Sequence, residues 1–222
     1  MTRKADGVRD ALQAASRVYD ALKRAAMPGA AEHALERAVL EAAGEHEVRY
    51  DLLTGPRTAD IEGGATDRVL AAGDAVLLDL CLRSGEYWCD VCRTYFLGSP
   101  PEDALQTYEK LHTCVRFAAG LLRPGAAAAA LYGAVETYFR DNGLQGCLKH
   151  HTGHGIGLTP FEAPVETATS GDFLKEGDVV TVEIGAYFKG RYGIRLEDDY
   201  LVTAQGAVLL WEYPMALQNA IL

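Results

Sequence analysis

The sequence GDAVLLDLCLRSGEYWCDVCRTYFLG occupies residues 73–98. Two runs rich in apolar residues flank a short turn, which we place at Ser84-Gly85, and this pattern predicts a β-hairpin. A turn at that point sets Asp79 directly opposite Asp90, because the two residues lie at equal distances from it. Directly opposed residues share a face of the sheet, with Cβ atoms about 4.5–5.5 Å apart.

A second stretch, GDVVTVEIGAYFKGRYGIRLEDDYLVT, occupies residues 177–203 and predicts a second hairpin. A turn centred on Gly190 sets Glu183 opposite Glu197. Two like charges this close destabilise a sheet unless a cation lies between them, and a metal ion is the obvious candidate. The alternative is a pair of exposed acidic hairpins. The acids lie in strands that otherwise read as apolar core, and the pattern occurs twice, so we favour a metal site.

The two hairpins belong to an internal repeat of about a hundred residues. Gly73-Asp74 and the five residues after it match the segment that begins at Gly177, position for position. Upstream, the segment from Pro28-Gly29 matches the segment from Pro124-Gly125 in the same order. Such a repeat implies two similar halves related by a pseudo-two-fold axis. The natural place for four converging carboxylates is the seam between them.

The bulk composition limits the classes of function. A length of 222 residues suits one unit, residues 1–222, built of two internal halves at about 1–100 and 101–222. The net charge of −10 argues against nucleic acid as a partner. No apolar run has membrane-spanning length, and the N-terminus lacks the apolar core of a signal peptide. We therefore expect a cytoplasmic protein without a membrane partner, and the odd number of cysteines, 5, fits reduced thiols.

Apolar residues spaced three and four apart predict four helices. The first spans Val8 to Ala26, and the second ends near Ala43. The third is expected to start with Ser99 as its capping residue, and the fourth ends near Asp141. Residues 54–67 are rich in Gly, Thr and Asp and predict a loop.

Four carboxylates and one histidine form a plausible ligand set for two metal ions: Asp79, Asp90, Glu183, Glu197 and His154. Oxygen-rich sites with one imidazole suit Mn, Co, Fe or Zn, and the sequence does not choose among them. Two such ions about 3.5–4 Å apart can hold a bridging hydroxide and polarise a carbonyl group. The glycines on both sides of His154 allow a close approach of the backbone.

The motifs DLCLRSGEYWCDVCRT, TGHGIGL and GIRLEDDYLVT resemble those of the creatinase/aminopeptidase family, which includes methionine aminopeptidase, aminopeptidase P and prolidase. The resemblance implies the α+β pita-bread fold, with two pseudo-symmetric halves, a curved antiparallel sheet and outer helices. It implies that Asp79 chelates one metal ion, that His154 and Glu183 bind the other, and that Asp90 and Glu197 bridge them. It also implies a homodimer and leans towards the Xaa-Pro peptidases, without their separate N-terminal domain.

The chain departs from the family pattern at two outer positions. Glu62, in the loop TADIEG, stands where the family usually has a histidine. Phe161, in TPFEAP, stands where a second histidine usually follows the metal histidine by seven residues. Phenylalanine can neither donate a hydrogen bond to a tetrahedral intermediate nor shuttle a proton. His150 does match a third family histidine.

The leading interpretation is a hydrolase of a peptide or amide C–N bond in a small substrate, with two divalent metal ions. Glu183 is the expected proton acceptor by resemblance, and His150 and Glu62 are the other candidate catalytic residues. One alternative is a different enzyme on the same scaffold, acting as a C–N hydrolase or lyase on a small molecule. Another is a binding protein whose metal ions are structural.

Other polar residues receive plainer interpretations. Cys89 and Cys92 are three residues apart in a strand, so they point to opposite faces and are not expected to form a metal pair. Cys81 and Cys92 fall on the same face as the carboxylates. Arg93 and Arg195 are expected to orient carboxylates rather than clamp substrate.

Overall fold

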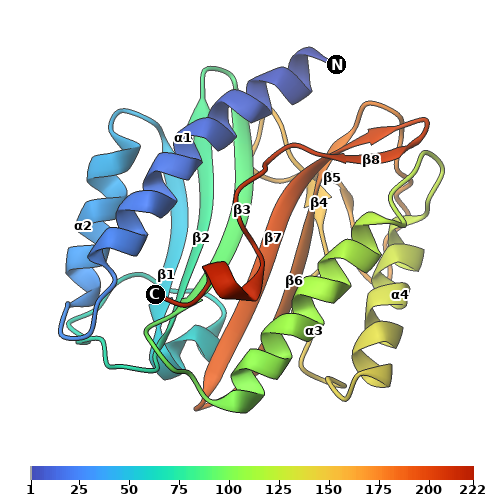
Figure 1. Cartoon of the computed structure of the whole chain (residues 1–222). Helices are drawn as coiled ribbons and strands as arrows, with labels where there is room; N and C mark the ends of the chain where they lie inside the picture. Colours follow the sequence, from blue (N-terminus) through green and yellow to red (C-terminus); the bar gives the residue numbers. More distant parts are fainter. Residues whose placement is uncertain (1) are drawn as a thin grey trace.

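The computed structural model describes residues 2–222 as four α-helices packed on one sheet (Figure 1). The sheet has 8 strands in the order β1-β2-β3-β7-β6-β4-β5, with β8 paired to β7. The helices are α1 (Arg3–Ala25), α2 (Glu32–Ala43), α3 (Glu102–Ala119) and α4 (Ala128–Asp141). The strands are β1 (Val48–Thr54), β2 (Ala75–Ser84), β3 (Tyr87–Phe96), β4 (His154–Gly155), β5 (Glu162–Val165), β6 (Val179–Phe188), β7 (Tyr192–Thr203) and β8 (Gly206–Leu209).

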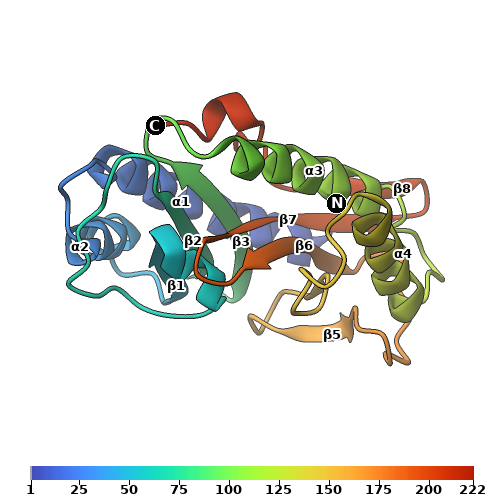
Figure 2. The same ribbon diagram turned by 90° about the horizontal axis from the view of Figure 1, so that it is seen from below.

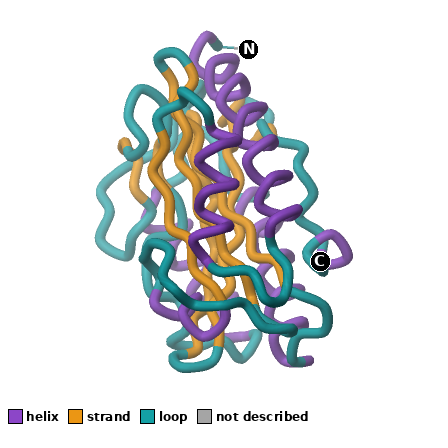
Figure 3. Tube along the Cα trace, turned by 90° about the vertical axis from the view of Figure 1, so that its left-hand side faces the viewer, coloured by secondary structure: helices purple, strands orange, loops and turns teal. Residues whose placement is uncertain are grey.

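The long helices cover one face of the sheet. Helix α1 packs on β2 and β3, and α3 packs on β6 and β7, as Figure 2 shows from below. Figure 3 looks from the α1–α2 side and shows the strands curving behind these two helices. The even-numbered side chains of β2, such as Leu78 and Leu80, belong to the main core under the helices. The odd-numbered side chains of β2 therefore face away from the helices, and Asp79 is among them.

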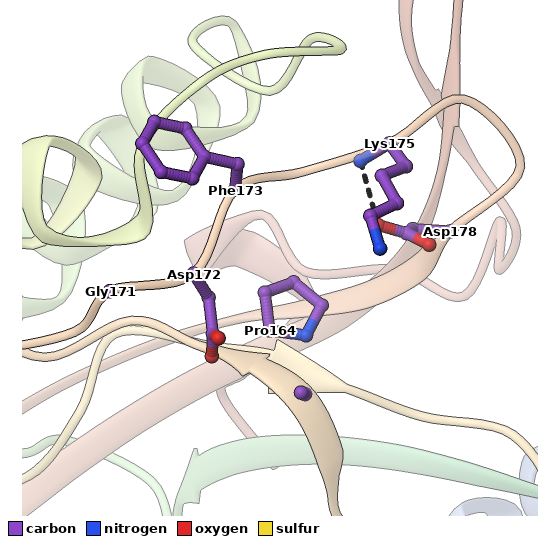
Figure 4. A pocket seen from close by; sticks show the side chains of 7 residues that line it. Pro164, Gly171, Asp172, Phe173, Lys175 and Asp178 are labelled. Carbon is purple, nitrogen blue, oxygen red and sulfur yellow. Dashed lines mark hydrogen bonds between the residues drawn. The ribbon is translucent and has the colours of Figure 1, made fainter.

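The internal repeat is visible in matching turns before the two hairpins. Before β2, the Asp74 carboxylate accepts a hydrogen bond from the Ala71 N–H at 2.7 Å. Before β6, the Asp178 carboxylate accepts one from the Lys175 N–H, also at 2.7 Å (Figure 4). The two hairpins then meet in the middle of the sheet, where β3 pairs with β7. The two matching segments of the sequence thus form the same kind of turn before their hairpins.

The first hairpin turns one residue later than the sequence predicted. Ser84 pairs with Tyr87, so the two turn residues are Gly85 and Glu86 rather than Ser84 and Gly85. Gly85 has a φ of 61°. A type II′ hairpin turn requires a positive φ at its first central position, and glycine adopts it without strain. This requirement selects Gly85 as the first residue of the turn.

The late turn makes the predicted pairing of Asp79 with Asp90 wrong. Asp79 is opposite Cys92, and Asp90 is opposite Cys81. The partner shifts by two residues, and the side-chain period of a strand is also two, so both carboxylates stay on the same face. They are diagonal neighbours instead of direct partners.

In the second hairpin the predicted pairing is confirmed, because Glu183 is opposite Glu197. Gly190 lies at the centre of a three-residue connection between Phe188 and Tyr192, with a φ of 77°. The expected cap at Ser99 is wrong. Helix α3 starts at Glu102 after Pro101, which makes no side-chain cap hydrogen bond.

The loop expected at residues 54–67 includes a 3-10 helix, Gly55–Asp60, beside the end of β1. Beyond β8 the chain turns back to the core, where Phe96 bridges to Ile221. Among residues 2–222, no helix is long and apolar enough to cross a membrane.

Candidate metal centre

A row of polar side chains crosses five adjacent strands on the face away from the helices. Its members pair directly from strand to strand and are Asp51 on β1, Asp79 on β2, Cys92 on β3, Glu197 on β7 and Glu183 on β6. Direct partners share a face, so the register alone collects these groups into one line. Cys92 and Glu197 pair with each other at the contact between the two hairpins.

Two further groups complete the set that the sequence singled out. Asp90 lies beside the row on β3, and His154 comes from β4, which pairs with β6 through Gly155 and Val180. Ligand atoms of Asp90, His154 and Glu197 lie within 4.8 Å of one another, and so do those of Asp79, Glu183 and Glu197. All five predicted metal ligands are thus brought together, and Glu197 belongs to both groups.

The donor atoms of this cluster suit divalent metal ions. Both carboxylate oxygens of Glu197 and one of Asp90 are buried without a hydrogen-bond partner in residues 2–222. The Glu197 side chain is only 1% exposed. A buried carboxylate without a partner is strongly unfavourable, and oxygen donors with one imidazole are the ligands that Mn, Fe, Co or Zn accept.

His154 is held in the tautomer that a metal ligand needs. Its Nδ1 lies 2.9 Å from the Gly155 carbonyl oxygen, which can only accept a hydrogen bond, so Nδ1 carries the proton. Nε2 is thereby turned towards the carboxylates and lies 3.5 Å from Asp90 Oδ2. Burial lowers the pKa of His154, but Asp90 raises it to about 9, so a metal ion bound at Nε2 would replace a proton there. A backbone carbonyl that fixes the other ring nitrogen is the usual support of a metal-bound histidine. Gly153 permits this arrangement, because a Cβ there would lie 2.3 Å from the Thr181 carbonyl oxygen.

The acids of the cluster have opposite pKa shifts. Burial and the neighbouring charges of Asp90 and Glu183 raise the pKa of Glu197 well above its ordinary value. Burial also raises the pKa of Asp79, against the lowering effect of Arg195. Burial alone would raise the pKa of Glu183, but His150 and Arg195 lower it to about 2. Carboxylates this crowded ionise together only when more positive charge is supplied.

Arg195 orients two of the carboxylates, as the sequence predicted. Its Nη1 donates to Asp79 Oδ2 at 2.7 Å and lies 3.4 Å from Glu183 Oε1. Nη2 donates to the Ile61 carbonyl oxygen and so ties residues 55–63 to the site. Arg93 acts elsewhere, because it lies on the helix-facing side and pairs with Asp198 at 2.6 Å.

His150 lies next to Glu183 in a pair with Tyr187. The Tyr187 hydroxyl lies 2.7 Å from His150 Nε2, and His150 Nδ1 lies 3.4 Å from Glu183 Oε1. Gly185 makes the pair possible, because a Cβ there would lie 2.5 Å from the Tyr187 hydroxyl. His150 is therefore at the site, as expected.

The two positions that depart from the family pattern lie at the edge of the site. Phe161 is 51% exposed and packs its ring against His154, with centroids 4.4 Å apart. Glu62 is exposed, and within residues 2–222 its side chain has no hydrogen bond or ion pair to the five ligands. Its charge contributes to the raised pKa of Asp51, for which burial is the largest cause. The structure thus places Glu62 at the rim.

Three residues at the site were missed in the sequence. Asp51 could have been found by extending the hairpin pairing to β1, but no tight turn fixes that register. Tyr187 is four residues after Glu183 and so shares its face, a signal that was present. His151 lies in an irregular segment, where no periodicity predicts the direction of a side chain.

The cysteines follow the strand alternation. Cys89 belongs to the main core under the helices, whereas Cys92 packs with Leu53 and Leu77 on the other face. The two thiols therefore point to opposite faces of the sheet, as strand alternation predicts. Cys81 lies opposite Asp90 and adjoins the site.

A pocket near β5 lacks comparable chemistry. It is lined by residues that include Pro164, Asp172, Lys175 and Asp178 (Figure 4). The Asp172 carboxylate accepts from the Val165 N–H at 3.0 Å, and Asp178 accepts from Lys175 N–H. Both acids are engaged in local turn structure, so the carboxylate row remains the candidate site.

Known proteins share this architecture. The model of metallopeptidase family M24 matches residues 6–204. The probable dipeptidase PepE of Mycobacterium bovis is 38% identical over 165 residues, which are 74% of this chain and 44% of that protein. The chain therefore spans less than half the length of this curated relative.

Solved structures give the same picture. Dipeptidase PepE from Mycobacterium ulcerans matches with a TM-score of 0.91 and 33% identity, over 100% of this chain and 60% of that one. Xaa-Pro dipeptidase from Bacillus anthracis matches with a TM-score of 0.93 and 27% identity, over 100% and 63%. The expected α+β pita-bread fold is confirmed by these likenesses.

Proposed function

The chain belongs to metallopeptidase family M24, and on that premise we propose that it is a metal-dependent hydrolase of peptide or amide C–N bonds. The observation that carries the proposal is the buried cluster of unpaired carboxylate oxygens on Glu197 and Asp90 beside Nε2 of His154. The similar proteins are named dipeptidase and Xaa-Pro dipeptidase. A small peptide is accordingly the proposed substrate.

We propose that Asp79, Asp90, His154, Glu183 and Glu197 hold two divalent metal ions. When bound, these ions polarise the scissile carbonyl and make water nucleophilic at neutral pH. Glu197 is the natural shared ligand, because it lies where the two hairpins meet and belongs to both ligand groups.

The remaining steps fall to groups of the chain itself. Glu183 is the proposed proton acceptor, because it belongs to a ligand group and lies next to His150. Arg195 holds Asp79 and Glu183 in place, so that both carboxylates keep their orientation when the substrate binds. The His150–Tyr187 pair borders Glu183 and supplies hydrogen-bonding groups beside the reacting carbonyl.

Phe161 favours a second candidate, a different C–N hydrolase or lyase on the same scaffold. Its half-exposed ring puts an apolar wall beside His154, where the family pattern has a histidine. An outer hydrogen-bond donor is worth roughly two to three orders of magnitude in turnover. Restoring histidines with Glu62→His and Phe161→His should therefore increase Xaa-Pro cleavage if the departures specialise the site. Ordinary Xaa-Pro turnover by the parent protein would contradict that specialisation.

The direct test is a turnover assay on protein reconstituted with Mn, Co, Fe or Zn. Dipeptides with and without proline should be cleaved, with kcat in the range of about 1 to 10³ s⁻¹ for the best substrate. Glu86→Gln is the matched control, because Glu86 lies in the turn of the first hairpin and pairs only with exposed Arg3 among the described residues. Metal-loaded protein that cleaves no peptide or amide would overturn the proposal. Catalytically silent metal ions would then favour the binding-protein alternative.

Further expectations belong to this proposal. We propose manganese as a physiological metal, a cytoplasmic location and a homodimer, with residues 1–222 acting as one unit. Metal analysis of protein purified without added metal tests the first. Sedimentation equilibrium tests the oligomeric state, and a monomer at micromolar concentration would contradict the dimer.

A further inference from the structure

His151 is an imidazole at the metal centre to which the family motif assigns no role. Its Nδ1 lies 3.2 Å from Glu183 Oε2, and its side chain is 24% exposed. Its ring meets that of His154 edge to face, with centroids 5.2 Å apart and an interplanar angle of 87°. His151 therefore reaches the oxygen of Glu183 that is opposite the one near His150.

His150 cannot serve as a further metal ligand beside it. His150 Nδ1 lies 2.6 Å from the His151 carbonyl oxygen, an acceptor, so Nδ1 is the protonated nitrogen. Nε2 then accepts from the Tyr187 hydroxyl at 2.7 Å. Both nitrogens are used, so His150, His151 and Glu183 do not form a third ion site although their ligand atoms lie close together.

His151 is in a different situation. Its Nδ1 is buried and makes no aligned hydrogen bond within the part of the chain that the structure describes. The atom nearest to hand is Glu183 Oε2, a carboxylate oxygen that accepts hydrogen bonds strongly. The 3.2 Å between the two atoms is close to the usual length of an N–H···O hydrogen bond.

Phe161 supports the position of this imidazole. The Phe161 ring contacts His151 at a centroid distance of 5.4 Å and His154 at 4.4 Å. The residue that replaces the family histidine thus packs against another histidine of the same site. The chain keeps an outer imidazole, but at a different position.

We propose that His151 is a positioning residue, which donates a hydrogen bond from Nδ1 to Glu183 Oε2. The inference rests on the proposed function. It gives Glu183 a separate support for each oxygen, with Arg195 at Oε1 and His151 at Oε2. A carboxylate held at both oxygens loses little freedom when it binds a metal ion.

The test compares two substitutions by metal titration calorimetry of metal-stripped protein with Mn²⁺ and Co²⁺. His151→Phe keeps a ring for the edge-to-face contacts but removes the donor, and the affinity for one ion should fall about 10- to 100-fold. His151→Asn keeps an N–H near the place of Nδ1 and should stay within about threefold of the parent. His33→Phe is the matched control, because His33 contacts Glu36 at 3.1 Å on the exposed surface of α2. Thermal melts establish that each variant is folded.

Unchanged affinity in His151→Phe overturns the inference, and so does an equal loss in His151→Asn. The affinities are measured without substrate, so they decide the role of His151 even if the protein cleaves no peptide. That second result would overturn the proposed function alone.

Discussion

The two acidic hairpins reach the same chemical result by different registers. In β6–β7, Glu183 and Glu197 are direct partners across a three-residue connection. In β2–β3, the two-residue turn at Gly85-Glu86 leaves Asp79 and Asp90 as diagonal neighbours. Both arrangements keep the two acids on one face, because the registers differ by an even number of residues. The site therefore depends on which face the acids occupy and tolerates a change of direct partner.

The two hairpins also differ in the residue that stands two positions after the first acid of each. Cys81 follows Asp79 on the first, and Gly185 follows Glu183 on the second. Gly185 leaves the space in which Tyr187 reaches His150. The second hairpin thus carries the groups proposed for proton transfer, and the first supplies metal ligands with thiols beside them.

The largest effect is expected at Glu197, the proposed ligand shared by both metal ions. Glu197→Gln should remove both metal ions and lower peptidase turnover by about 10³-fold or more, because it removes several kcal/mol of electrostatic stabilisation. Asp90→Asn should remove at least one ion. Elemental analysis of reconstituted protein checks both, with Glu86→Gln as the control.

The same substitution has a second readout in metal-stripped protein. Glu197 has a raised pKa because it is buried among other carboxylates, so Glu197→Gln should increase the thermal stability of that form. Full metal occupancy in Glu197→Gln would contradict its role as the shared ligand.

The second effect concerns the opposite face of β7. Asp198 pairs with Arg93, which also donates to the Glu197 carbonyl oxygen at 2.7 Å and so ties β3 to β7. Asp198→Asn leaves a buried guanidinium without its counter-charge, and the free energy of unfolding should fall by about 3 kcal/mol. Metal content should stay unchanged. Chemical denaturation measures the loss, and a fall of less than about 1 kcal/mol would show that the pair does not hold the hairpins together.

The third expected effect is a pH dependence of folding stability, and it comes from Glu166, which precedes the second hairpin in the chain. Burial raises the pKa of Glu166 from 4.5 to about 7, although Thr152 and His154 lower it. The folded protein therefore binds this proton more tightly than the unfolded chain does. The contribution is complete below about pH 4.5 and is lost as the pH rises through about 7, a change of about 3 kcal/mol.

Glu166→Gln should remove this slope. Denaturant titrations of parent and variant at pH 5 and pH 8 measure it, with Glu176→Gln as an exposed control on the same half. Parallel pH dependences in the parent and in Glu166→Gln would mean that Glu166 does not carry the effect.

Strand alternation explains how much of this site was predictable from the sequence. Moving a two-residue turn by one position shifts each strand partner by two residues, which keeps every side chain on its face. The wrong turn position at Ser84-Gly85 therefore left the predicted face of Asp79 and Asp90 unchanged. The position of the turn depends on the sign of φ at Gly85, which the amino-acid sequence alone does not give. The direction of the His151 side chain depends on packing against Phe161 in an irregular segment, where no helix or strand periodicity predicts it.

The smallest effect is expected at Gly185, and it is compared with Cys81, which holds the corresponding position in the first hairpin. Gly185→Ala places a methyl group 2.5 Å from the Tyr187 hydroxyl and 2.7 Å from His150 Nε2. Both atoms belong to side chains that can move, so the cost in stability should be about 1 kcal/mol, at the low end for overpacking. The displaced pair loses its hydrogen bond, and kcat should fall more than KM rises. Cys81→Ala removes a sulfur at the corresponding position and should leave kcat nearly unchanged. Chemical denaturation and steady-state kinetics on both variants test the contrast, and equal kinetic losses would show that the two positions do not differ in the way the structure indicates.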